Sequence, residues 1–168
     1  MPGNHDVPLD DPFLRVLAPF SRYRRHIATD LEPVHEDEAM IVAGVNTVTR
    51  WVWRQGRLGA AMVERLARLF SRADGRTCIA VMHHPVEQLP EGAKTPMRGA
   101  ATAIGPLRAA GALVVLSGHV HLVHAAPATA EPGILLVQAG TGISGRPGAL
   151  SLDGPCPPTP ARAPGVRG

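Results

Sequence analysis

Residues 77–84 read TCIAVMHH, and this stretch decides the fold class. Its first six residues are largely apolar and have the length of a strand, and His83 and His84 follow directly. A short apolar run of this kind is typical of a strand that is covered on both faces of a sheet. Because the loops at the carboxyl ends of parallel strands gather functional side chains, the two histidines also predict where a site lies.

The alternation of strands and helices extends in both directions from this stretch. A broken helix is expected first, because Pro12 and Pro19 interrupt an otherwise helical spacing of apolar residues. The expected elements are a broken helix over 10–25, strands over 39–45, 77–82, 112–116 and 134–137, an amphipathic helix over 58–70 and a weaker helix over 98–110. Strand, helix, strand, helix, strand is the order that builds parallel sheets by crossover connections. The sequence therefore predicts an α/β domain.

Length and composition limit the function classes. The chain has 168 residues with 45% hydrophobic content, which predicts one globular domain with a sizeable core. Only 4% of the residues are aromatic, which argues against base-stacking surfaces for single-stranded nucleic acid. The net charge is +3, but the arginine cluster at 22–25 has no second cluster beside it and is interpreted as a solvated helix end. No specific nucleic-acid binding is expected.

Cysteine usage and hydropathy predict a cytoplasmic protein without a membrane span. Cys78 lies in an apolar run and Cys156 in a proline-rich segment, so they make no disulfide framework. The sequence shows no signal peptide and no apolar run near the ~20 residues that span a bilayer. Residues 145–168 are rich in Pro, Gly, Ala and Arg without a hydrophobic period. The predicted organisation is a domain over 1–144 and a disordered tail over 145–168.

Three histidine-bearing signatures occur beside the expected strands. They are GNHD at 3–6, HHP at 83–85 and GHVH at 118–121. Imidazole nitrogens and an amide oxygen suit Zn, Mn or Fe, and on an irregular loop the two histidines of GHVH reach different metals. Each signature alone has an ordinary interpretation as a turn, a strand-end histidine or a pair of surface histidines. Their joint occurrence in this order favours a metal site.

The three signatures resemble the later sequence blocks of the calcineurin-like metallophosphoesterases, and the resemblance covers residues 2–142. Residues 44–47 and 56–58 are similar to the class III cyclic-nucleotide phosphodiesterase-like branch. The resemblance implies a metallophosphoesterase-type sandwich of two mixed β-sheets flanked by helices. It also implies a dinuclear site for two metal ions, Mn, Fe or Zn, at one end of the sheets.

The resemblance also implies roles for single residues. Asn4, His83 and His119 resemble ligands of the second metal, and His121 resembles a ligand of the first. His5 resembles the acid that protonates the leaving group, Asp6 resembles its orienting partner, and His84 matches a position that lines the site. The implied reaction is in-line attack of a hydroxide on a small phosphoester such as a cyclic nucleotide.

The sequence departs from the family pattern in one respect. The family's Asp-x-His and Gly-Asp-x-x-Asp blocks, which supply the carboxylate ligands, do not occur in this sequence. We therefore expect a domain that lacks N-terminal strands and helices, weak metal binding by three neutral ligands, and apolar sheet surface left uncovered. A start codon assigned inside a longer reading frame is one hypothesis for the departure. The chain is then either part of a phosphoester hydrolase or a non-catalytic remnant that serves as a binding module.

Overall fold

A single mixed sheet organises the chain, in the order β1-β2-β3-β4-β6-β5-β7. The computed structural model describes residues 1–52, 54–88, 95–140 and 150–151. The strands are β1 (Val34–Glu36), β2 (Met40–Val45), β3 (Thr77–Met82), β4 (Val114–His121), β5 (Val123–Pro127), β6 (Leu135–Gly140) and β7 (Leu150–Ser151). The helices are α1 (Pro12–Leu17), α2 (Ser21–His26), α3 (Ala60–Phe70) and α4 (Ala100–Ala109). This architecture confirms the predicted α/β class. Among these helices, none is both long and apolar enough to cross a bilayer.

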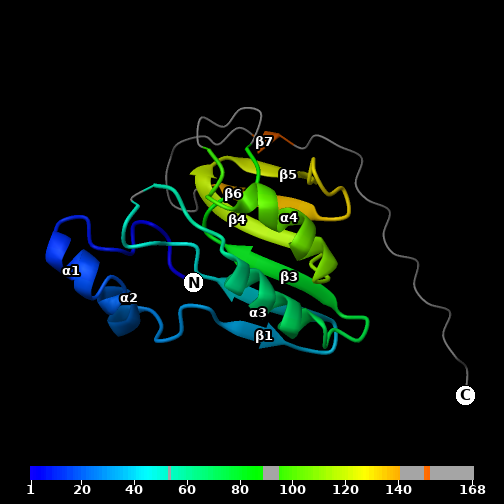
Figure 1. Cartoon of the computed structure of the whole chain (residues 1–168), viewed down its shortest axis with the longest axis horizontal. Coiled ribbons are helices and arrows are strands. Elements are labelled where there is room, and N and C mark those ends of the chain that lie inside the picture. The colour runs from blue at the N-terminus through cyan, green and yellow to red at the C-terminus, as the bar shows by residue number, and fades with distance from the viewer. Residues whose placement is uncertain (53, 89–94, 141–149, 152–168) are drawn as a thin grey trace, which may run out of the picture.

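The centre of the sheet is parallel, and its crossovers run through two helices. β2, β3, β4 and β6 are parallel neighbours, whereas β1 and β5 pair antiparallel with β2 and β6. α3 connects β2 to β3 and α4 connects β3 to β4, and Figure 1 shows both helices in front of the sheet. Parallel pairing brings the carboxyl ends of β2, β3 and β4 to one edge, which is where the three signatures were expected to meet.

The core lies between this sheet and the two helices. α3 buries an apolar stripe, and Leu66 and Leu107 are fully buried against the strands. From the sheet, the core receives every second residue of the central strands: Ile41, Ala43, Val45, Cys78, Ala80, Met82, Val115 and Leu136. Burial raises the pKa of the Cys78 thiol, which fits a packing role rather than a reactive one.

The opposite face of the sheet is also apolar, but it is only partly buried. Val42, Ile79, Val114 and Leu135 are register neighbours across four strands, and each is partly exposed. The resemblance implies a second sheet in contact with the first. The structure shows no second sheet in the described ranges, because all seven strands there pair within one sheet.

Three further features differ from the sequence prediction. β1 and β5 were missed, because both are short and lack a fully buried residue. β4 continues through the GHVH signature to His121 instead of ending at residue 116. β7 lies within the range expected to be disordered, and the rest of that range, with Cys156, lies outside the described residues. The broken helix is confirmed as α1 and α2, and the Asp11 carboxylate caps α1 by accepting the Leu14 amide at 2.8 Å.

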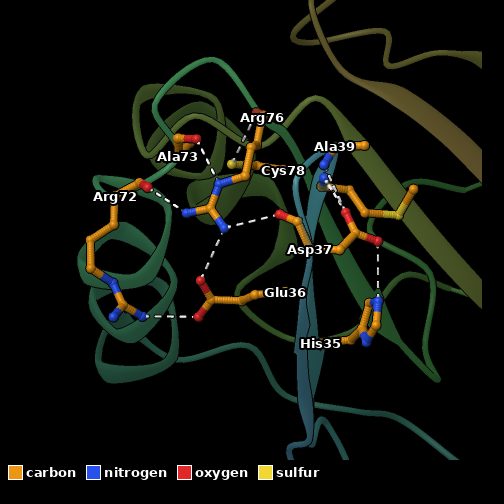
Figure 2. A network of polar contacts seen from close by, with 9 residues as sticks. His35, Glu36, Asp37, Ala39, Arg72, Ala73, Arg76 and Cys78 are labelled. Carbon is orange, nitrogen blue, oxygen red and sulfur yellow. Dashed lines mark hydrogen bonds and ion pairs between the residues drawn. The ribbon is translucent and has the colours of Figure 1, made fainter.

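A polar network fastens the edge strand β1 at the end of the sheet away from the strand-end histidines (Figure 2). The Glu36 carboxylate accepts hydrogen bonds from the Arg72 and Arg76 guanidinium groups, each at 3.2 Å. In the next turn, the backbone amides of Ala39 and Met40 donate to Asp37 and, with a smaller contribution from His35, lower the pKa of its carboxyl. The network ties β1 to the residues that follow α3.

We expect Glu36→Gln to lower the free energy of unfolding by less than ~1 kcal/mol, because this carboxylate and Arg72 are open to solvent. Urea unfolding at low and high salt measures the effect. The loss should shrink as salt rises, and a loss that is the same at both ionic strengths would contradict an electrostatic origin.

Candidate metal centre

Asn4, His83 and His119 meet at the carboxyl ends of β3 and β4. The Oδ1 of Asn4 lies 2.7 Å from Nε2 of His83 and 3.1 Å from Nδ1 of His119. The two ring nitrogens are themselves 3.1 Å apart. The chain separates Asn4 from the two histidines by 79 and 115 residues, so only the fold brings the three polar atoms together.

The turn at 3–6 presents Asn4 to the histidines. Asp6 closes this turn by accepting the Gly3 amide at 2.7 Å, and its own amide donates to the Gly3 carbonyl at 3.1 Å. A Cβ at Gly3 would lie 2.9 Å from Cε1 and Nδ1 of His83, so the turn is packed directly against this ring. Asn4 is 7% exposed. A side chain at position 3 would therefore displace the His83 ring or the turn that carries Asn4.

A bulge in β4 aims His119 at the site. The pairing of β4 with β6 shifts register between Ser117 and His121, and His119 adopts φ 73°. A left-handed backbone at a residue other than glycine costs on the order of 1–3 kcal/mol and is often found at functional sites. The GHVH signature therefore lies on an irregular strand rather than on a loop, and His119, 9% exposed, projects toward Asn4 and His83.

His84 belongs to the same group of side chains. Its ring centroid is 4.9 Å from that of His83 and 4.7 Å from that of His119. One ring nitrogen from each of the three histidines lies within 4.8 Å of the others, so the group could hold a metal ion. The sequence interpretation placed His84 only on the lining of the site. It also overlooked Thr47, which contacts His84, although the position of Thr47 just beyond a predicted strand offered a signal.

The other predicted site residues lie outside this group. His121 is exposed and, in the described ranges, its ring is not among the clustered histidine nitrogens. His5 is exposed on the turn that carries Asn4. The carboxylate of Asp6 holds the Gly3 amide, and among the described residues it makes no hydrogen bond to His5. The structure thus brings together Asn4, His83, His84 and His119.

The donor set is chemically suited to a transition-metal ion. Three imidazoles and an amide oxygen are the ligands that Zn, Mn and Fe accept, whereas Ca and Mg prefer sets rich in carboxylates. Ligands bound at ~2.0–2.1 Å around a tetrahedral zinc lie about 3.3 Å apart. The separations of 2.7–3.1 Å among Asn4, His83 and His119 are close to this value. In the described part of the chain, no carboxylate belongs to the cluster, so the donor set is neutral.

We expect His121→Gly to raise the free energy of unfolding by up to ~1 kcal/mol in the presence of a chelator. His121 is exposed and has φ 63°, so glycine removes strain without removing packing. His26→Gly, at the end of α2, is the matched control and should lower stability by up to ~1 kcal/mol. Urea unfolding compares the two variants, and an equal loss in both would contradict the strain at His121.

No protein-family model matches this sequence, and no curated protein is similar enough to it to count as a relative.

Proposed function

We propose that this chain carries one metal site of a metallophosphoesterase centre and that its chemistry is the hydrolysis of small phosphoesters. One observation carries the proposal: Asn4, His83 and His119, the three residues that the resemblance assigns to a single metal, converge within 2.7–3.1 Å. Histidines that cluster by chance would not be expected to contact the one asparagine that the resemblance assigns to the same metal.

The residues around the proposed ion have distinct tasks. Asn4, His83 and His119 would hold a Zn, Mn or Fe ion, which would supply Lewis acidity for negative charge on a phosphoryl oxygen. Because these donors are neutral, they would not cancel the positive charge of the ion, which would attract an anionic phosphate. His5 is exposed beside Asn4, where its ring can donate a proton to the oxygen of the leaving alcohol.

The lack of carboxylate ligands sets the expected strength of this site. The first metal of a dinuclear centre would have only His121 as a ligand in this sequence, and His121 is exposed and, in the described ranges, outside the group of clustered histidines. We therefore propose one metal ion per chain and slow turnover, with full activity only where carboxylates are supplied by further protein. The competing function is metal binding without catalysis.

Metal loading and turnover test the proposal together. The purified chain is dialysed against Zn²⁺, Mn²⁺ or, without oxygen, Fe²⁺, and its metal content and its hydrolysis of bis-p-nitrophenyl phosphate are measured. We expect about one equivalent of metal and turnover that a chelator abolishes. Bound metal without turnover would support the competing function, and a chain that binds no metal would overturn both.

Asp6→Asn should lower turnover by about 10- to 100-fold, the usual effect of a residue that supports a metal ligand. Its carboxylate holds the Gly3 amide at 2.7 Å, and this contact shapes the turn that presents Asn4 and His5. Asp11→Asn is a matched control, since Asp11 accepts the Leu14 amide at 2.8 Å in α1. Steady-state kinetics compare the variants, and equal losses in both would show that the turn at 3–6 has no special role.

A further inference from the structure

Thr47 contacts His84, one of the three clustered histidines. The Oγ1 of Thr47, just beyond the carboxyl end of β2, lies 2.8 Å from Nδ1 of His84. Thr47 is fully buried and His84 is 2% exposed, so the contact is shielded from water. A hydrogen bond in such surroundings restricts the orientation of the ring more strongly than one at the surface.

Gly56 packs closely against the His84 ring near the same nitrogen, Nδ1. A Cβ at this position would lie 2.3 Å from Nδ1 of His84, nearer than any side chain tolerates. The backbone here is fixed, because the Arg57 amide donates to the Thr47 carbonyl at 2.9 Å and the Arg98 amide donates to the Gly56 carbonyl at 2.9 Å. The His84 ring is therefore restrained by the Thr47 hydroxyl and by the hydrogen-bonded backbone at Gly56.

We propose that Thr47 is a positioning residue that prepares His84 to bind a divalent transition-metal ion beside His83 and His119. The Thr47 oxygen accepts the proton of His84 Nδ1, so the neutral ring carries its lone pair on Nε2. Partners of this kind fix the tautomer and orientation of metal-binding histidines. The inference rests on the proposed function, and it makes His84 a metal ligand rather than a lining residue.

Two substitutions of Thr47 test this role. Thr47→Val removes the hydroxyl while keeping the shape of the side chain, and Thr47→Ser keeps the hydroxyl. We expect Thr47→Val to weaken Co²⁺ binding by about 10- to 100-fold and to change the visible absorption of bound Co²⁺, while Thr47→Ser stays within a few-fold of the wild type. Circular dichroism and thermal unfolding confirm that each variant is folded. Co²⁺ affinity in Thr47→Val equal to that of the wild type would overturn the proposal.

A measurement without metal separates this inference from the proposed function. Nitrogen-15 NMR of the histidine rings, in the metal-free protein at a pH where imidazole is neutral, should show His84 protonated on Nδ1 in the wild type and in Thr47→Ser. Thr47→Val should lose this preference. If the wild type binds no Co²⁺, the proposed function fails, and the NMR result still decides the role of Thr47. A proton on Nε2 of His84 in the wild type would overturn the inference alone.

Gly56→Ala provides an independent check, because the added methyl group must displace the His84 ring from Thr47. We expect Co²⁺ binding to weaken by at least as much as in Thr47→Val. Gly59→Ala is the matched control, since nothing lies within 4 Å of a Cβ at that position. Equal Co²⁺ affinities in the two glycine variants would show that the His84 ring does not depend on the close packing at Gly56.

Discussion

Replacing His83 with alanine is expected to weaken Zn²⁺ binding by at least about 100-fold, more than the loss of a supporting residue causes. Nε2 of His83 lies 2.7 Å from Asn4 Oδ1 and 3.1 Å from His119 Nδ1. Removing the ring leaves only Asn4 and His119 of the three proposed ligands. Competition with a chromogenic chelator measures the affinity.

His26→Ala is the matched control for this substitution. His26 is exposed at the end of α2, so its loss should leave Zn²⁺ affinity unchanged. The unfolding of metal-free His83→Ala should resemble that of the metal-free wild type, because the ring is only partly buried. Wild-type Zn²⁺ affinity in a folded His83→Ala chain would remove this residue from the metal site.

His5→Ala is expected to lower turnover by about 10²- to 10⁴-fold while Zn²⁺ affinity stays within a few-fold of the wild type. His5 is exposed and lies outside the clustered histidines of the described residues, and the proposed function therefore gives it proton donation rather than metal binding. A general acid matters most when the departing oxygen is strongly basic. The loss should therefore be larger for an alkyl phosphodiester than for bis-p-nitrophenyl phosphate.

His35→Ala is the control for the loss of an exposed histidine, since His35 lies in the network on β1 at the other end of the sheet. Kinetics with both leaving groups distinguish proton donation by His5 from a role of His5 in substrate binding. An equal loss with both substrates would indicate a role in substrate binding, and an unchanged rate would exclude His5 from catalysis.

The sequence predicted the part of the fold that is governed by burial. The central strands β2, β3, β4 and β6 appeared as apolar runs because both of their faces carry apolar residues. β1 was not predicted because all three of its residues are exposed, and its sequence therefore shows no alternation of apolar and polar residues. It is placed by antiparallel pairing with β2 and by contacts with Arg72 and Arg76, which come from a distant part of the chain.

The candidate site was predictable to a similar extent. The convergence of His83 and His119 follows from the rule that parallel strands share one carboxyl edge. The orientation of His119 does not, because it depends on a bulge that forms only when β4 pairs with β6. The same rule places Thr47 and His84 at one edge, but it does not predict that the Thr47 hydroxyl lies 2.8 Å from Nδ1 of His84, because that distance depends on how the two side chains are oriented.

The row formed by Val42, Ile79, Val114 and Leu135 has a practical consequence for every experiment on this protein. Apolar surface that is exposed to solvent promotes self-association as the protein concentration rises. Sedimentation over a dilution series should therefore precede any titration with metal. A metal-binding constant that changes with protein concentration would reflect self-association of the protein rather than metal binding by the histidines.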